Sequence, residues 1–141
     1  MQLMKLLFIV PTILAAFFLE SCKQWSNDRA SKENTLFRQV SSKDSGVDFS
    51  NTLSERDSFN AIFYEFFYNG SGVAIGDVNN DGFSDIFLGG NMVASRLYLN
   101  KGNLIFEDIT ESAGINTSGK WVTGVNMVDI NQDGKLDIKT K

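Results

Sequence analysis

Hydrophobic residues occur along this chain in short runs that polar and glycine-rich segments separate. Four such runs predict strands, at residues 72–76, 85–89, 95–100 and 104–110, and a fifth covers residues 122–129. The runs are rich in β-branched and aromatic residues, and glycine or asparagine marks most of their ends, which is typical of β-strands. The pattern therefore predicts an all-β fold in which four strands occupy about 50 residues, followed by the start of a second such unit.

Two nine-residue segments between these runs share one pattern, with Asp at positions 1, 5 and 9, Asn at position 3 and Gly at position 6. The first copy begins at Asp77 and the second at Asp129, 52 residues later, so the chain contains a structural repeat. Ca²⁺ takes six to eight oxygen ligands, and short Asp and Asn side chains at alternate positions of a tight loop supply them. The predicted side-chain ligands are Asp77, Asn79, Asp81, Asp85, Asp129, Asn131, Asp133 and Asp137, and the main-chain carbonyls of Phe83 and Lys135 are predicted to add one oxygen each.

The spacing excludes an EF-hand. Position 12 of an EF-hand loop is a bidentate Glu, whereas this chain has Leu88 and Thr140 at that position. The flanking residues are also strand-like instead of helical. A metal-free Asp-Gly hairpin turn is the alternative, but such a turn requires only the Asp-Gly pair. The recurrence of Asp at positions 1 and 9 and Asn at position 3 favours metal binding.

Composition narrows the classes of function. The chain has 141 residues, enough for about one domain, and a net charge of −4 without a basic patch, so no nucleic acid is expected as a partner. It contains no histidine, which excludes Ser-His-Asp and Cys-His catalysis and histidine-ligated zinc within these residues. The acidic residues outside the two loops are scattered, and none forms an evident catalytic pair. The sequence therefore predicts that the chain is not an enzyme and has no catalytic residues.

The N-terminus has the features of an export signal. Residues 6–19 are apolar except for Thr12, a run too short for a comfortable membrane span, and Lys5 precedes them. The run ends in Leu-Glu-Ser-Cys, which looks like the lipobox of bacterial lipoproteins, although Glu20 departs from it. Cys22 is the only cysteine in the chain and is the predicted lipid anchor. An ordinary secretory signal with an incidental cysteine is the alternative.

The sequence predicts that the chain is divided into three segments. Residues 1–21 are the predicted lipoprotein signal peptide, residues 22–47 a polar tether, and residues 48–141 the folded part. Within the tether, residues 35–40 are expected to form a short strand. The aromatic run at residues 59–68 is expected to be a strand, or a short helix leading into one. Exposed, its rings could stack on sugars, but burial in the core is the favoured interpretation.

Residues 72–86, Gly-Val-Ala-Ile-Gly-Asp-Val-Asn-Asn-Asp-Gly-Phe-Ser-Asp-Ile, resemble the FG-GAP/VCBS-type repeat of integrin α-subunit propellers and many bacterial surface proteins. The wider stretch resembles the N-terminal part of large bacterial VCBS-repeat lipoproteins, some of which carry an ASPIC/UnbV module further on. The resemblance implies about one and a third four-stranded blades of a β-propeller with calcium-binding loops. Repeat one would cover about residues 72–120 and repeat two residues 121–141, which end inside the second strand of a blade. The chain is therefore expected to be an N-terminal fragment of a longer protein.

Two functions are consistent with these features. The first is a calcium-stabilised extracytoplasmic binding or adhesion module that a lipid on Cys22 anchors to the membrane, at the outer membrane, the cell surface or in the periplasm. Its partners would be a glycan or a protein, bound through further blades. The alternative is the N-terminal part of a secreted carbohydrate-active enzyme, such as a calcium-dependent polysaccharide lyase.

Overall fold

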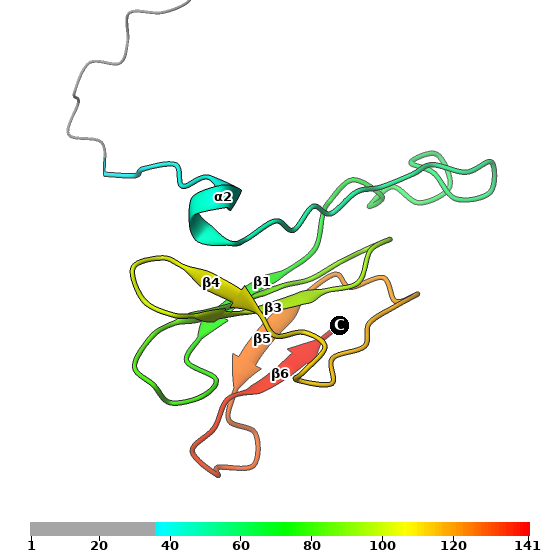
Figure 1. The fold of residues 1–141 in the computed structure, drawn as a ribbon. Coiled ribbons are helices and arrows are strands. Elements are labelled where there is room, and N and C mark those ends of the chain that lie inside the picture. The colour runs from blue at the N-terminus through cyan, green and yellow to red at the C-terminus, as the bar shows by residue number, and fades with distance from the viewer. Residues whose placement is uncertain (1–35) are drawn as a thin grey trace, which may run out of the picture. The chain divides into compact units, whose positions relative to one another are not determined.

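Two antiparallel sheets contain nearly all of the regular structure in the computed structural model, which describes residues 36–141 (Figure 1). The first sheet has four strands that pair in chain order: β1 (Val73–Gly76), β2 (Asp85–Leu88), β3 (Arg96–Asn100) and β4 (Phe106–Asp108). The second is a hairpin of β5 (Val125–Val128) and β6 (Asp137–Thr140). A four-stranded antiparallel sheet with its strands in chain order is the composition of a propeller blade. The prediction of an all-β fold is confirmed.

The two hairpins that carry the Asp-rich loops have matching registers. Gly76 lies opposite Asp85 at the end of the β1–β2 ladder, and Val128 lies opposite Asp137 at the end of the β5–β6 ladder. The predicted strands agree with the observed ones to within three residues at each end, and β4 and β5 are shorter than the runs at residues 104–110 and 122–129. Each loop therefore closes a strand–loop–strand unit, and the second unit repeats the first two strands of the first.

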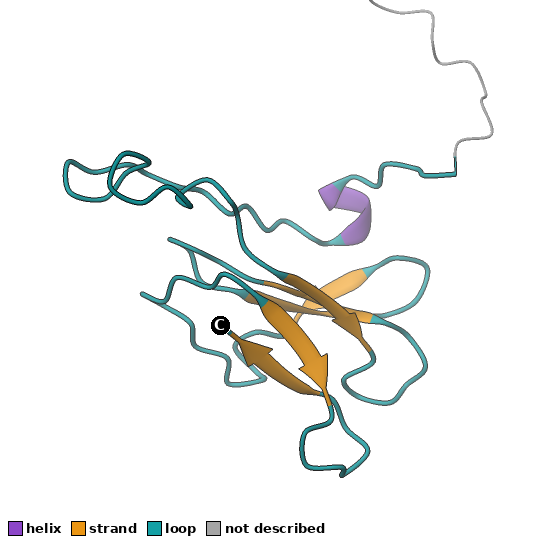
Figure 2. Ribbon diagram, turned by 180° about the vertical axis from the view of Figure 1, so that it is seen from behind, coloured by secondary structure: helices purple, strands orange, loops and turns teal. Residues whose placement is uncertain are grey.

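Strands β1 and β5 pack against each other, which joins the two sheets (Figure 2). A Cβ on Gly72 would overlap the Val125 nitrogen and lie 2.8 Å from the carbonyl carbon of Gly124. At the other end of β1, a Cβ on Gly76 would lie 2.6 Å from Cδ1 of Leu136. The glycines before and at the end of β1 therefore permit a close approach that no larger residue would allow.

The core is small and lies mainly on one face of the first sheet. Its buried hydrophobic residues are Phe67, Ala74, Phe87, Leu97, Tyr98 and Val122. Phe87 is the cross-strand partner of both Ala74 and Leu97, so the centre of the core spans three adjacent strands. The Tyr98 hydroxyl donates to Asp48 Oδ1 over 2.9 Å, and burial, together with this hydrogen bond, raises the pKa of Tyr98 to about 12.

The aromatic run at residues 59–68 forms a series of turns, so the prediction of a strand or of a helix leading into one is wrong. The Asn60 side chain accepts hydrogen bonds from the N–H groups of Ile62 and Phe63, which stabilises a turn in place of a strand. The prediction that the rings are core is correct for Phe67, whose ring centroid lies 5.5 Å from that of Trp121. The run also leaves hydrophobic side chains exposed, namely Ile62, Phe63, Phe66 and Tyr68.

The last residues of the predicted tether pack against the first sheet. Residues 36–40 contain no strand, which corrects the prediction of a short strand at residues 35–40 for the described part of that segment. A one-turn helix, α2 (Ser42–Ser45), follows, with Ser41 as its N-cap and Gly46 ending it at φ 78°. A Cβ on Gly46 would overlap the Phe106 carbonyl oxygen of β4. The chain is therefore already part of the folded unit at Gly46.

The predicted signal peptide, Cys22 and the first part of the tether lie outside the described residues. Among residues 36–141, no helix has the length and the apolar character needed to cross a membrane.

Candidate cation-binding loops

The first loop joins β1 to β2 and is folded around the carboxylate of Asp77. The N–H of Asp81 donates to Asp77 Oδ1 over 3.1 Å, and that of Gly82 donates to Asp77 Oδ2 over 2.8 Å. Asn79 Oδ1 accepts a second bond from the Asp81 N–H at 3.1 Å. Asn80 and Gly82 have φ values of 60° and 88°, and these two left-handed residues turn the backbone around the carboxylate.

The second loop has the same hydrogen bonds. Asp129 accepts from the N–H of Asp133 over 3.1 Å and from that of Gly134 over 2.8 Å. The Asn131 amide donates to Asp133 Oδ2 over 3.0 Å, as the Asn79 amide does to Asp81 Oδ2 over 2.8 Å. Gln132 and Gly134 take φ values of 62° and 84°. Because the two loops have different residues at positions 2, 4, 7 and 8, the shared pattern of Asp, Asn and Gly is what determines this geometry.

The two loops differ in how position 9 is held. Asp85 is fully buried and accepts from the N–H of Val78 over 2.9 Å and from that of Asn100 over 2.8 Å. The Asn100 amide also donates to the Ser84 carbonyl over 2.9 Å. Asp137 is half-buried and accepts from the Ile130 N–H over 3.0 Å. Strand β3 therefore anchors the first loop, and the second loop has no equivalent anchor among the described residues.

A hydrogen bond joins the two loops directly. The Asn80 side-chain amide, at position 4 of the first loop, donates to the carbonyl oxygen of Gly134 in the second loop over 3.0 Å. Asn80 is not among the residues that the pattern predicts as ligands, because position 4 of the motif is variable. The presence of an amide side chain at position 4 in both copies, Asn80 and Gln132, is the only signal of this contact in the sequence.

Hydrogen bonding keeps the central carboxylates of both loops ionised. The Asn79 amide and the N–H of Phe83 hold the pKa of Asp81 below its ordinary value. The Asn131 amide and the N–H of Lys135 do the same for Asp133. Each loop therefore presents a negative charge at position 5 at neutral pH, which favours a cation.

The donor set of each loop fits Ca²⁺ by its chemistry. Every predicted side-chain ligand offers oxygen. A carboxylate has about four lone-pair sites, and the hydrogen bonds to Asp77 from the N–H groups of Asp81 and Gly82 use two of them. As the loops stand, the carboxylates are turned to the backbone N–H groups. Within residues 36–141, no three His, Cys, Asp or Glu side chains converge as a finished metal site. Ion binding would thus require side-chain rotation within a loop backbone that is already in place.

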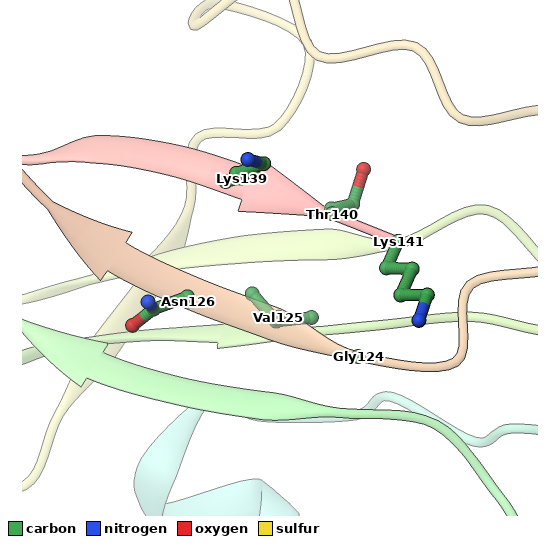
Figure 3. A pocket seen from close by; sticks show the side chains of 6 residues that line it. All are labelled: Gly124, Val125, Asn126, Lys139, Thr140 and Lys141. Atoms are coloured by element: carbon green, nitrogen blue, oxygen red, sulfur yellow. The ribbon is translucent and has the colours of Figure 1, made fainter. Parts of the chain in front are cut away.

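The outer end of the second hairpin is hollowed. The hollow has a volume of about 250 Å³, and Figure 3 shows the side chains around it. It is lined by Gly124, Val125, Asn126, Lys139, Thr140 and Lys141. Gly124 is the counterpart of Gly72 in the repeat, yet a Cβ on Gly124 would meet no atom within 4 Å. The surface that β5 covers on the first repeat is therefore open on the second.

Comparison with known proteins identifies the repeat. Residues 77–138 match the model of the FG-GAP-like repeat family. The chain is 39% identical to cartilage acidic protein 1 of Xenopus tropicalis over 69 residues. This aligned segment covers 49% of this chain and 11% of that protein. It is 35% identical to integrin alpha-8 of Mus musculus over 85 residues. This aligned segment covers 50% of this chain and 8% of that protein. The chain thus spans about a tenth of the length of these relatives. No solved structure matches it significantly.

The matched region begins at Asp77 and ends at Ile138, so it contains both loops and all the strands between them. The resemblance drawn from the loop pattern is thereby confirmed at the level of the repeat. The chain thus contains an FG-GAP-like repeat segment, over residues 77–138.

Proposed function

We propose that this chain is a Ca²⁺-stabilised, extracytoplasmic module for binding or adhesion, without enzymatic activity of its own. The observation that carries the proposal is that two loops, 52 residues apart, fold around an aspartate with the same hydrogen bonds. A plain Asp-Gly turn requires none of the other positions that the two copies share. The similarity to an integrin alpha subunit and to cartilage acidic protein favours an extracellular binding role.

The loop residues would each have one role. Ca²⁺, when bound, would supply two positive charges that offset the repulsion among the three carboxylates of a loop. In the first loop, the ligands would be Asp77, Asn79, Asp81 and Asp85 with the Phe83 carbonyl. In the second, they would be Asp129, Asn131, Asp133 and Asp137 with the Lys135 carbonyl. Each loop also fixes the end of a hairpin, so binding at the loop would stabilise the register of the two strands.

The open face of the second hairpin suits a further repeat of the same kind. Gly72 is covered by β5, whereas its counterpart Gly124 is open beside the hollow of Figure 3. A third strand pair placed against β5 as β5 lies against β1 would fill that space. A glycan or protein ligand would then bind to a surface formed by several repeats, and a lipid on Cys22 would hold the module at a membrane.

Isothermal titration calorimetry with Ca²⁺ tests the proposal on the chain, on Asp77→Ala and on Asp129→Ala, each of which should lose one site. Glu111→Ala is the control, since it removes a carboxylate outside both loops. Extracellular modules bind with a Kd on the order of 10⁻⁴ M. At about 1 mM Ca²⁺, each occupied site should then add roughly 1.4 kcal/mol to the free energy of unfolding. A chain that shows neither Ca²⁺ heat nor a Ca²⁺-dependent shift in Tm would refute the metal assignment.

A further inference from the structure

The bond from Asn80 to Gly134 lies at a sensitive place in the second loop. The Gly134 carbonyl and the Lys135 N–H belong to one peptide group. Asn80 Nδ2 binds the carbonyl end of this group over 3.0 Å, and Asp133 Oδ1 binds its N–H end over 2.9 Å. The peptide plane is therefore held on both sides, once from the first loop and once from within the second. The next carbonyl along the chain is that of Lys135, the position-7 ligand.

In the first loop, the corresponding peptide group is held, among the described residues, only from within its own loop. The N–H of Phe83 donates to Asp81 Oδ1 over 2.8 Å, as the N–H of Lys135 does to Asp133. The Gly82 carbonyl, however, accepts no hydrogen bond from any residue between 36 and 141. Conversely, β3 holds position 9 of the first loop through Asn100. The first loop is thus held by its own sheet, and the second is held by the first loop.

The backbone of Asn80 suits this role. Its φ of 60° is in the left-handed region, which asparagine tolerates better than most residues, and the turn directs its side chain out of its own loop. A hydrogen bond between loops that belong to successive repeats can transmit order from one to the other, because the donor is fixed only while its loop is folded.

We propose that Asn80 is a positioning residue that couples the two cation loops, so that order in the first loop raises the affinity of the second for Ca²⁺. This inference rests on the proposed function. Asn80 would touch no ion. It would act through the Gly134–Lys135 peptide, by fixing the direction of the Lys135 carbonyl before the ion arrives. Loss of Asn80 should therefore weaken the second loop and leave the first nearly unchanged.

An NMR titration of the chain with Ca²⁺ separates the two sites in one sample. The amides of Gly82 and Gly134 donate to Asp77 and Asp129, so each reports on its own loop. In Asn80→Gly, the Gly134 curve should shift to Ca²⁺ concentrations roughly two- to tenfold higher, the effect of one hydrogen bond. The Gly82 curve should move less than about twofold. Asn103→Gly is the matched control, because Asn103 also has a positive φ, of 55°, but lies in the turn after β3. It should move neither curve.

A double-mutant cycle tests whether Asn80 carries the coupling between the loops. Asp77→Ala should weaken the Gly134 response in the presence of Asn80 and have a smaller effect on it in Asn80→Gly. Equal shifts of both curves in Asn80→Gly, or no shift of either, would overturn the proposal.

Amide hydrogen exchange without Ca²⁺ gives a result even if the chain binds no ion. The Lys135 amide should exchange roughly two- to tenfold faster in Asn80→Gly than in Asn103→Gly. An unchanged Lys135 rate would overturn the positioning role. If the two variants show this rate difference but the wild-type chain shows no Ca²⁺ response, the proposed function alone is refuted.

Discussion

The Cβ that Gly72 lacks would overlap the backbone nitrogen of Val125. The residue that precedes β1 therefore touches the first residue of β5, 53 positions later in the chain. The contact leaves no room for a side chain at position 72. This contact, with the close approach of Leu136 to Gly76, explains why a glycine precedes β1 and another ends it, a feature that strand propensity alone would disfavour.

Gly72→Ala should destabilise the chain by about 1–3 kcal/mol, because the new methyl group must push β1 and β5 apart. Gly124→Ala is the matched control at the equivalent position of the second repeat, where the space is open, and it should change stability by less than about 0.5 kcal/mol. Urea unfolding followed by circular dichroism measures both. Equal costs for the two variants would contradict the packing of β1 on β5.

Asp85→Ala should cost more stability than Asp137→Ala, measured in the presence of EGTA so that no cation contributes. Asp85 is buried and satisfies the N–H groups of Val78 and Asn100, whereas Asp137 is half-buried and satisfies that of Ile130. Leaving these two half-buried N–H groups unpaired should cost roughly 2–4 kcal/mol, against about 1 kcal/mol for Asp137→Ala. If Asp137→Ala proves the costlier variant, the anchoring of the first loop by β3 is wrong.

The stability of the folded chain should fall as the pH rises from about 10 to 12. Burial and the bond to Asp48 raise the pKa of Tyr98 to about 12 from its ordinary 10.0, so in this window the folded chain retains a proton that the unfolded chain has released. By linkage, a shift of this size removes about 2–3 kcal/mol of stability across the window. Tyr98→Phe should flatten this slope, while Tyr64→Phe should retain it. Chemical denaturation at several pH values gives the slopes, and identical slopes in all three proteins would exclude Tyr98 as their source.

Cys22 should become the lipidated N-terminus after removal of residues 1–21. Radiolabelled palmitate should enter the wild-type chain in bacterial cells and should be absent from Cys22→Ser. Mass spectrometry of the mature N-terminus provides an independent check. Label that persists in Cys22→Ser, or a mature chain that begins elsewhere, would remove the lipoprotein assignment.

The strands and loops of the repeat could be predicted because local sequence determines them. The Asp, Asn and Gly positions of each loop build its hydrogen bonds within nine residues, and short β-branched runs flank them. The aromatic run at residues 59–68 is harder to predict, because it is mostly apolar and does not show the alternation that assigns a strand to one face. The turn stabilised by Asn60 and the packing of Phe59, Tyr64 and Phe67 on Trp121 determine its conformation.

Contacts between distant residues could not be predicted from a single sequence. Asn51 and Asn91 exchange two hydrogen bonds across 40 residues, and Asn91 also donates to the Val122 carbonyl. Asn80 reaches Gly134 in the same way. Each of these is an amide in a polar segment, where the composition predicts only a loop, so nothing in the local pattern distinguishes a structural asparagine from a solvated one.

The two sides of the contact between β1 and β5 differ, because Gly72 and Gly76 on the β1 side meet the backbone at Gly124 and Val125 and the side chain of Leu136 on the other. An interface whose halves differ is a head-to-tail interface, and each added copy repeats the rotation of the previous one. Whether such a series closes into a ring or grows as an open helix depends on that rotation alone. A substitution at Gly72 would therefore alter the angle between two successive repeats. In a series of identical interfaces, a small change of this angle decides whether the last repeat can contact the first.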